Sequence, residues 1–449
     1  DGSDIQDRLV NLINVPDINL RSNLYTTEDF LDSLQVSKNY MADQNLYIRE
    51  RIFDMWTGDW NKTNENWEWQ SHTVNDSVIY TPIVIDRNHA FTKVDGVLFK
   101  QMLKMLSLDF ICNYDSLILK DTKKINKLAF ALDMAVAGRS DESVWIRQAQ
   151  EIQRQMTDSL IDSAFTYLPE GVKHDEIELI KRKLKRRRLE LEAVASQYYR
   201  LLQRTPVVAG TNQSDYFLIE RQAPDRTVLR IYDPETGDCR LEQQFSGKET
   251  KELWLYGLAG NDTFEVKGNT RKDFPIYLIS GEGENQYQLN HNRKIHVYDK
   301  DYKYDYQKIK YHKISFTPWG IYDSDKGISL GTFFTYTMYG FKRAPFTYQH
   351  RIGYNYLKGF MYAGIFPNYD GRRRLYLNAS ISSPRNFENF FGFGNNTAGY
   401  KEEKKNYNRV KLRTYMFNPS FEMDLRKEEV MTFFGSLDMY KAKRTDDRK

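Results

Sequence analysis

The sequence contains few cysteines and no long apolar segment. Cys112 and Cys239 lie far apart in unlike contexts, so their spacing indicates no disulfide framework and leaves a single bridge open. No eighteen consecutive residues are apolar, so no transmembrane helix is expected. The first residues, "DGSDIQDRLV", lack the pattern of a signal peptide. We therefore expect either a processed protein or a piece of a longer one.

An excess of charge of one sign is also absent. The 65 lysines and arginines nearly balance the 61 aspartates and glutamates, and the net charge of +4 implies no nucleic-acid partner. The seven histidines are scattered, and no pair has the spacing of metal ligands. Neither feature points to a chemical activity.

The periodicity of the apolar residues divides the chain into three predicted domains of a multidomain α+β protein. Residues 1–204 have a mainly helical pattern, with short extended pieces near Val78 to Ile85. Residues 205–301 have period two and predict a small all-β domain, whereas residues 302–449 contain longer strands. The basic run Lys181 to Arg188 favours a solvated helix face over contact with an anionic lipid headgroup.

Residues 302–449 alternate most strictly between apolar and polar side chains. In "RRLYLNASISS", Leu375 and Leu377 face one way, while Asn378 and Ser380 face the other. Strands of about ten residues with this pattern predict an outer-membrane β-barrel. The alternative is a soluble sandwich, whose strands are usually nearer five or six residues. About seven strands are counted, fewer than the eight or more of single-chain bacterial barrels, so the barrel is expected to be incomplete.

Three motifs in this region carry a family resemblance. They are the D-x-D-x-G-I turn at Asp323 to Ile328, the run Gly340 to Phe346 and the Asn-Phe-Phe-Gly-x-Gly-Asn-x-Thr stretch at Asn389 to Thr397. With His350, they resemble the barrel of the bacterial surface antigen family, which includes outer-membrane insertases and two-partner-secretion transporters. The resemblance implies the outer membrane of a Gram-negative bacterium, a periplasmic N-terminal region, and a role in inserting or translocating proteins. Outer-membrane lipid and protein cargo, or other subunits of an outer-membrane complex, are the partners it implies.

The first half resembles a subgroup of that family in which a metallophosphoesterase domain precedes the barrel. The likeness rests on "GDWNKTNENWEW" (Gly58 to Trp69), "IDRNHAF" (Ile85 to Phe91) and "LKRRRLELEAVASQYYRLL" (Leu184 to Leu202). The metal-ligand motifs of the phosphoesterase itself do not occur in the sequence, so no dimetal hydrolysis is assigned.

The segment from Gly58 to Trp69 also resembles the catalytic loop of atypical kinases. Such a loop needs a carboxylate to deprotonate the acceptor hydroxyl, and an amide and a second carboxylate to hold magnesium. On this alignment Asn61 stands where the catalytic aspartate belongs, whereas Asn66 and Asp86 keep the two magnesium ligands. General-base catalysis is then lost unless Asp59 replaces it. We expect a degenerate kinase-like region without activity, or a purely structural core around the tryptophans.

Two glycine-rich turns in the β-domain resemble the calcium repeat of parallel β-helices. They are "YGLAGNDTFEV" and "ISGEGENQYQL", in which Asp262 would be a calcium ligand. The second copy has Asn285 in the corresponding place. Plain turn glycines in a short stacked β-domain are the favoured interpretation.

Three functions follow from these patterns. The first is an outer-membrane barrel of the surface antigen type with a periplasmic accessory region. The second is a membrane-tethered phosphoryl-transfer or phosphoesterase-associated enzyme, and the third is a structural subunit of a larger outer-membrane complex. Magnesium or calcium are the only cofactors considered, with Asn66, Asp86 and Asp262 as ligands.

Overall fold

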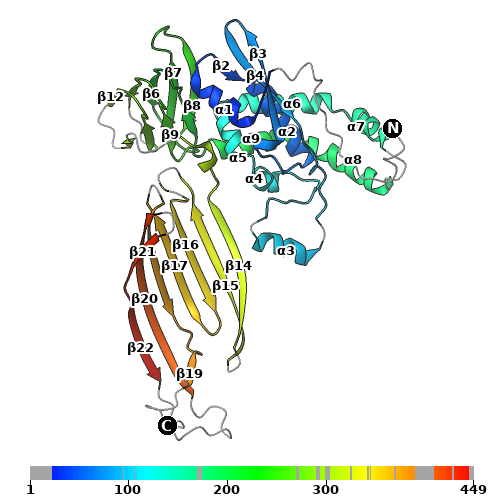
Figure 1. Ribbon diagram of the computed structural model, residues 1–449. Coiled ribbons are helices and arrows are strands. Elements are labelled where there is room, and N and C mark those ends of the chain that lie inside the picture. The colour runs from blue at the N-terminus through cyan, green and yellow to red at the C-terminus, as the bar shows by residue number, and fades with distance from the viewer. Residues whose placement is uncertain are drawn as a thin grey trace. The chain divides into compact units, whose positions relative to one another are not determined.

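The computed structural model describes residues 23–94, 96–106, 108–168, 174–268, 273–289, 294–298, 304–323, 326–340, 343, 345–368, 371–389, 409–426 and 429–443 (Figure 1). The chain is a multidomain α+β protein with two compact units. One unit contains residues 1–100 and 109–309, so it includes almost all of both predicted N-terminal domains; the other contains residues 101–108 and 310–449.

The helices lie in the N-terminal half of the chain. They are α1 (Thr27–Val36), α2 (Gln44–Thr57), α3 (Val97–Met105), α4 (Thr122–Ile125), α5 (Phe130–Ala137), α6 (Glu142–Gln155), α7 (Asp158–Ala164), α8 (His174–Arg188) and α9 (Leu191–Leu202). Helix α6 shows why they form, because Trp145, Ala149 and Ile152 recur at helical spacing and are all buried. The Thr26 side chain caps the start of α1, and Gly58 ends α2 in the left-handed conformation.

No helix among the described residues has both the length and the apolar character needed to cross a membrane.

A four-stranded sheet packs among these helices, although the sequence predicts only short extended pieces there. Its strands are β1 (Leu24–Tyr25), β2 (Tyr40–Ala42), β3 (Trp67–Val74) and β4 (Ser77–Val84), in the order β1-β3-β4-β2. Strand β3 begins with buried Trp67 and Trp69 alternating with half-buried residues, which is a strand pattern. The Trp69 ring stacks on Phe30 at 3.7 Å between centroids, so the tryptophans of the predicted kinase loop form part of a core.

The β-domain is a short solenoid whose strands alternate between two sheets. The strands are β5 (Val207–Ala209), β6 (Tyr216–Gln222), β7 (Arg226–Tyr232), β8 (Cys239–Ser246), β9 (Leu253–Tyr256), β10 (Thr263–Lys267), β11 (Ile276–Ile279), β12 (Gln286–Leu289) and β13 (Ile295–Tyr298). One sheet has the strand order β13-β11-β9-β5, and all its strands are parallel. The other sheet has the order β12-β10-β6-β7-β8. Its strands β12, β10 and β6 are parallel, whereas β6, β7 and β8 form an antiparallel meander. Phe217 and Phe264, in successive coils, stack at 4.6 Å in the core between the sheets.

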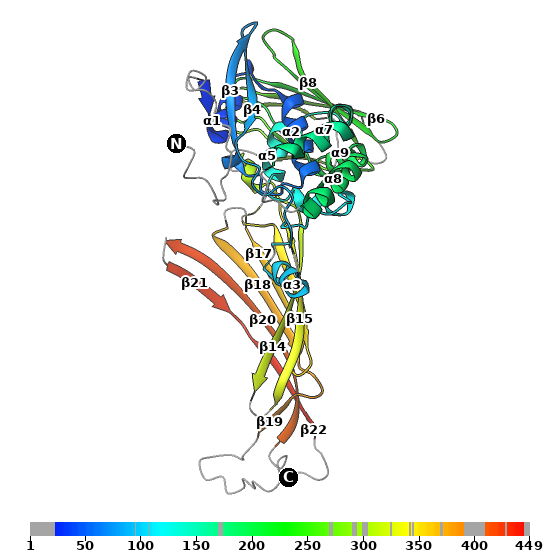
Figure 2. The ribbon, with the colours of Figure 1, turned by 90° about the vertical axis from the view of Figure 1, so that its right-hand side faces the viewer.

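The second unit is one broad antiparallel sheet, seen in two views in Figures 1 and 2. Its strands are β14 (Lys313–Asp323), β15 (Gly327–Met338), β16 (Tyr348–Asn355), β17 (Gly359–Pro367), β18 (Arg373–Ile381), β19 (Phe387–Asn389), β20 (Arg409–Arg426), β21 (Glu429–Phe434) and β22 (Leu437–Lys443). Strands β14 to β18 form a meander that continues to β20, which also pairs with β19, β21 and β22. The last predicted strand is therefore two strands, β21 and β22, separated by Gly435 and Ser436.

The family motifs fall differently on this sheet. The turn at Asp323 to Ile328 joins β14 to β15, and Asp323 is opposite Gly327 in the ladder. His350 lies on β16, where Nδ1 is 2.9 Å from the Tyr362 hydroxyl. Parts of the run Gly340 to Phe346, and all of the stretch to Thr397 after Asn389, lie outside the described residues.

Candidate functional site

The residues predicted for phosphoryl transfer lie close together, between the end of α2 and the turn after β4. Asp59 follows Gly58, the last capping residue of α2. Asn66 ends a 3₁₀ turn, η3 (Asn64–Asn66), just before β3, and Asp86 follows β4. Because β3 and β4 are antiparallel neighbours, the Asn66 amide nitrogen lies 3.4 Å from a carboxylate oxygen of Asp86. The structure thus brings the two predicted magnesium ligands together.

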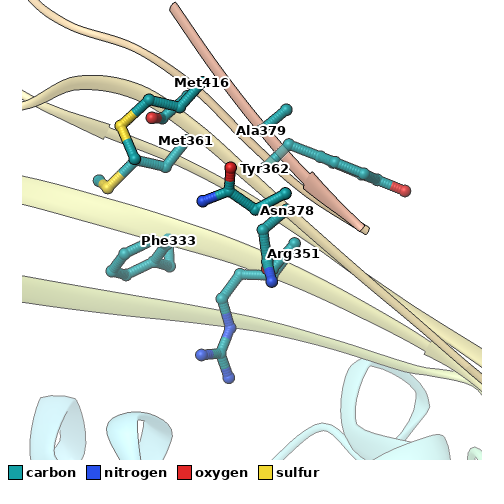
Figure 3. Close-up of a pocket in the computed structure, with 10 residues that line it drawn as sticks. Phe333, Arg351, Met361, Tyr362, Asn378, Ala379 and Met416 are labelled. Atoms are coloured by element: carbon teal, nitrogen blue, oxygen red, sulfur yellow. The ribbon is translucent and has the colours of Figure 1, made fainter. Parts of the chain in front are cut away.

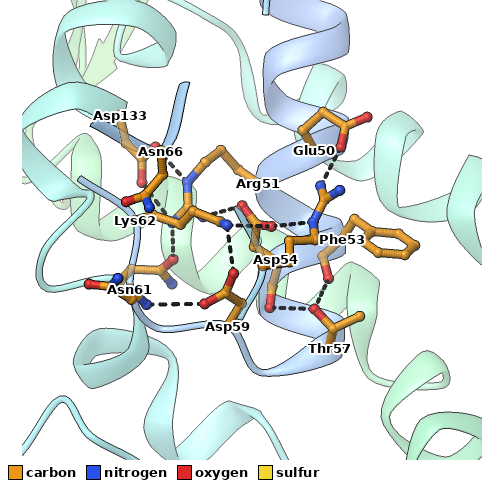
Figure 4. Close-up of polar contacts among 12 residues, drawn as sticks. Glu50, Arg51, Phe53, Asp54, Thr57, Asp59, Asn61, Lys62, Asn66 and Asp133 are labelled. Carbon is orange, nitrogen blue, oxygen red and sulfur yellow. Dashed lines mark hydrogen bonds and ion pairs between the residues drawn. The ribbon is translucent and has the colours of Figure 1, made fainter. Parts of the chain in front are cut away.

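A lysine ammonium lies at the centre of this group (Figure 4). Lys62 Nζ donates to Asp59 Oδ2 at 2.5 Å, lies 3.6 Å from Asp54 Oδ1 and also donates to the main-chain carbonyl of Asp86. The Lys62 side chain is 1% exposed. Lys62 is thus the buried cation that pairs with Asp59, and it shares Asp54 with Arg51, which is a role a metal ion would otherwise perform.

The amide of Asn66 is oriented for structure and not for metal binding. Its oxygen accepts hydrogen bonds from the Thr63 main-chain N–H at 2.8 Å and from the Thr63 hydroxyl at 3.0 Å. This leaves the amide nitrogen, a donor, toward Asp86. Magnesium requires oxygen ligands, so binding it between Asn66 and Asp86 would break the cap on η3.

Asp59 is held in a similar way. Its second carboxylate oxygen is 3.3 Å from the main-chain N–H of Asn61, and its side chain is almost wholly buried. Burial raises the pKa of Asp59, while the neighbouring Lys62 ammonium acts in the opposite direction. Each oxygen of this buried carboxylate thus accepts one hydrogen bond, from Lys62 or from the Asn61 main chain. Asp59 is held as part of a buried ion pair, away from solvent, and a general base must reach a substrate hydroxyl.

The same cluster continues into a buried ion-pair network. Arg51, on α2, donates from Nε to Asp133 Oδ1 at 2.8 Å and from Nη1 to Asp54 Oδ2 at 2.9 Å. Asp133, on α5, also accepts hydrogen bonds from the hydroxyls of Tyr47, at 2.7 Å, and Tyr198. Burial acts to lower the pKa of Arg51, but the carboxylates of Asp133 and Asp54 outweigh it and hold that pKa above its ordinary value. The network joins α2, α5 and α9 and is internally satisfied.

Sequence reasoning missed the residues that organise this cluster: Arg51, Asp54, Lys62 and Asp133. Two signals were present. Asp133 is the only charged residue within the apolar helix "FALDMAVA", and Arg51 and Asp54 fall on α2 among the buried residues Ile48, Ile52 and Met55. Charged residues in such places are retained only with partners.

The basic run on α8 is mostly paired within the molecule. Lys185 lies 2.8 Å from Asp162, and Arg188 lies 2.7 Å from Asp158. Arg187 is buried and donates to the carbonyl of Trp56 at 2.7 Å and to that of Met55 at 2.5 Å, at the C-terminal end of α2. A cation at this end of a helix is favoured by the helix dipole. Much of the run therefore holds helices together.

The predicted calcium residue lies at a stacked corner of the solenoid. Asp262 Oδ1 accepts the Asp215 N–H of the preceding coil at 2.9 Å, and the Asp262 N–H donates to Asn285 Oδ1 of the next coil at 2.8 Å. Gly260 and Gly283 take the positive φ angles of the corners, 97° and 121°. A Cβ atom added at Gly283 would lie 1.8 Å from the Gly260 carbonyl oxygen, so close stacking of the coils requires glycine there.

The other oxygen of Asp262 has no hydrogen-bond partner among the described residues. Oδ2 is buried, and the Asp262 side chain is 0% exposed. Burial raises the pKa of Asp262 to about 8; the N–H of Asp215 lowers it, and the nearby Asp215 carboxylate raises it further. Burial thus favours the protonated form of Asp262 at neutral pH. The described residues contain no group of three or more histidine, cysteine, aspartate or glutamate side chains that could hold a metal ion.

The broad sheet of the second unit presents two unlike faces. On one face of β14 and β15, Ile314, Ile328 and Leu330 are 76%, 73% and 70% exposed. On the opposite face, Ser329 is buried beside Asn355, and their side-chain oxygens are 2.5 Å apart. The same apolar face continues over the next strands through Ile352, Phe360, Leu375, Ile381, Phe417 and Phe421, all exposed. Large apolar side chains are thus exposed while small polar ones are covered.

Comparison of the chain with protein-family models, with curated proteins and with solved structures finds no match.

Proposed function

We propose that this chain belongs to an outer-membrane protein of the surface antigen type, with the sheet of the second unit in the bilayer and the first unit in the periplasm. The inserted sheet would be part of a β-barrel with its apolar face toward lipid. Its function would be to insert or translocate proteins at the outer membrane. Its partners would be outer-membrane lipid, its protein cargo and other subunits of an outer-membrane complex.

The contrast between the two faces of the sheet carries this proposal. Leaving one valine-sized to phenylalanine-sized side chain in water costs about 1.5 to 3 kcal/mol relative to burying it. Many such side chains cover one face, and a folded domain is stable by only about 5 to 15 kcal/mol. The face must therefore be covered, and contiguous apolar patches of this extent mark contact with a membrane or with another protein.

The position of a cavity on the sheet favours contact between the apolar face and lipid. A cavity of about 290 Å³ is lined mostly by side chains of the polar face, as expected if that face turns inward. A soluble sandwich encloses its apolar side instead. Strands β14 to β18 have 11, 12, 8, 9 and 9 residues, close to the 9–11 residues that a tilted strand needs to cross a bilayer.

A labelling experiment tests the location of the sheet. Cys112 and Cys239 are replaced by serine, and single cysteines are placed at Leu330 and Phe334 on the apolar face or at Thr335 and Gln349 on the polar face. Each is labelled with a fluorophore in the protein reconstituted in liposomes. Quenchers confined to the lipid should affect only the first pair, and water-soluble quenchers the second. Equal quenching at both pairs, or at none, would refute insertion.

A reconstitution experiment tests the function. Proteoliposomes with the protein should speed the acquisition of protease resistance by an unfolded outer-membrane barrel, relative to liposomes that contain an unrelated porin. An equal rate in both kinds of liposome would reject a role in insertion, even if labelling places the sheet in lipid.

A further inference from the structure

The cavity on the polar face of the sheet is lined by charged, polar and apolar side chains (Figure 3). It is lined from five strands that are hydrogen-bonded neighbours, β15, β16, β17, β18 and β20. The lining side chains that matter here are Phe333, Arg351, Met361, Asn378, Met416 and Asn418. Because each residue sits at a set position of an antiparallel ladder, the relative placement of these groups is held by backbone hydrogen bonds.

Phe333 forms a rigid part of this wall. Its ring stacks on Trp319 at 5.4 Å between centroids, with the planes 18° apart. It also lies over Gly353 of the next strand, where an added Cβ would come within 2.3 Å of the ring. Because Gly353 has no side chain, the Phe333 ring can lie flat against the sheet. The guanidinium of Arg351 stands 5.7 Å from the centre of the same ring.

Arg351 is a charged group without a counter-ion. Its Nε donates to Thr335 Oγ1 at 3.2 Å, and no described carboxylate forms an ion pair with it. Arg374, on the same face of the sheet, differs because it pairs with both Asp424 and Glu422. Figure 3 shows the Arg351 side chain extending away from the strands that carry Asn378 and Met416. Its two terminal amino groups therefore remain available to an anion.

The neighbouring amides add donors. Asn418 accepts a hydrogen bond from the Ser436 hydroxyl at 3.0 Å on its oxygen, so its amide nitrogen is left to donate. Asn378 lines the cavity from β18. On the same face of the sheet, the side chains of Met361, Met416 and Phe333 add apolar surface beside these polar groups. The cavity thus has a cation, amide donors and adaptable apolar side chains along one wall.

We propose that this cavity binds a small organic anion, with its carboxylate or phosphate group on Arg351 and a short apolar arm against Met361, Met416 and Phe333. A guanidinium group can form two parallel hydrogen bonds with either a carboxylate or a phosphate group. The volume of about 290 Å³ lies at the lower end of the range of small-molecule sites, which favours a short arm.

Calorimetric titration of the full chain in nanodiscs of zwitterionic lipid tests this assignment. The probes are hexanoate, hexyl phosphate, inorganic phosphate and hexanamide, the neutral isostere of hexanoate. At least one of the two hexyl anions should bind saturably and at least about tenfold more tightly than hexanamide. Whichever hexyl anion binds identifies the head group. Inorganic phosphate should bind more weakly than hexyl phosphate if the apolar arm contributes.

Two matched variants locate the site. Arg351→Gln should lower the affinity at least about tenfold, whereas Arg373→Gln, which removes the same charge from an exposed position at the start of β18, should leave it unchanged. Met361→Ala should weaken the binding of whichever hexyl anion binds, but not the binding of inorganic phosphate. Arg351→Lys keeps the charge and controls for folding, which circular dichroism checks for each variant.

Three outcomes would overturn the assignment. One is the absence of saturable binding of both hexyl anions. Another is an equal loss of affinity in Arg351→Gln and Arg373→Gln, which would indicate attraction to overall charge alone. The third is a fall in thermal stability of Arg351→Gln without any anion binding, which would show that the guanidinium is used within the protein itself.

Discussion

Replacing Asp262 by asparagine should stabilise the solenoid at neutral pH and remove much of its pH dependence. Asp262 is buried, with one carboxylate oxygen unpartnered, and its pKa is raised from 3.8 to about 8 by burial. Between about pH 4 and pH 8 the folded protein therefore holds a proton that the unfolded chain has released. The free energy of unfolding must then fall as the pH rises through this window.

The size of the change in the free energy of unfolding follows from this single proton. One group bound in the folded state and released in the unfolded state lowers the free energy of unfolding by up to about 1.4 kcal/mol per pH unit. The asparagine side chain of the variant would keep an oxygen to accept the Asp215 N–H, and Asn285 already performs the equivalent role in the next coil. Asp262→Asn should thus be neutral near pH 4 and stabilising by on the order of 1 to 4 kcal/mol at pH 7.

Amide hydrogen exchange measured by mass spectrometry, between pH 5 and pH 8, gives the opening free energy of peptides that cover residues 253–289. The slope with pH should be shallower in Asp262→Asn than in the unchanged protein. Asn285→Asp, which places a carboxylate at the equivalent corner, should steepen it, and Asp238→Asn at an exposed turn should not alter it. Equal slopes for Asp262→Asn and the unchanged protein, or a loss of stability in the variant at pH 8, would refute the reasoning.

Three further results are expected. Lys62→Met leaves Asp59 buried without its cation, while Asp54 keeps Arg51, and should lower the free energy of unfolding by about 3 to 5 kcal/mol, measured by thermal melting; an unchanged melting temperature would mean that the Lys62 ion pairs contribute nothing. Gly283→Ala places a Cβ against the Gly260 carbonyl and should raise hydrogen exchange in the neighbouring coils, so unchanged exchange would contradict the close stacking. Leu330→Arg should impair folding into liposomes by about 2 to 4 kcal/mol, whereas Gln349→Arg on the polar face should be tolerated; equal effects would contradict the assignment of the faces.

The local patterns of the sequence were sufficient for most elements. The helices α1 to α9 lie in the region of helical pattern, residues 1–204, and β6 and the long strands β14 to β18 lie in the regions of period-two alternation. Strand β8, "CRLEQQFS", was missed because its alternation is mostly among polar residues. The kinase resemblance places Trp67 to Trp69 in a catalytic loop, although these residues begin β3 and have the alternating burial of a strand.

The chemistry of the candidate site depends on contacts that sequence patterns do not predict. The kinase resemblance grouped Asn66 with Asp86, and the hairpin of β3 and β4 makes the residues before and after it neighbours. The sequence alone could not show that Lys62 fills the space among the carboxylates. Asp54 and Asp59 reach its ammonium group only once α2 has packed beside the loop. Nor could the sequence show which way the Asn66 amide points.

The sequence by itself determined the α+β composition, the positions of most strands and the two-faced character of the last region, because these depend on residue periodicity alone. Only the tertiary structure decided which strands pair in parallel, since coils far apart in the sequence must stack before Asp262 meets Asp215 and Asn285. It also decided that the buried charges neutralise one another. Burial and pairing are properties of the packed chain, and they determine whether a carboxylate acts as a ligand, an acid or a structural support.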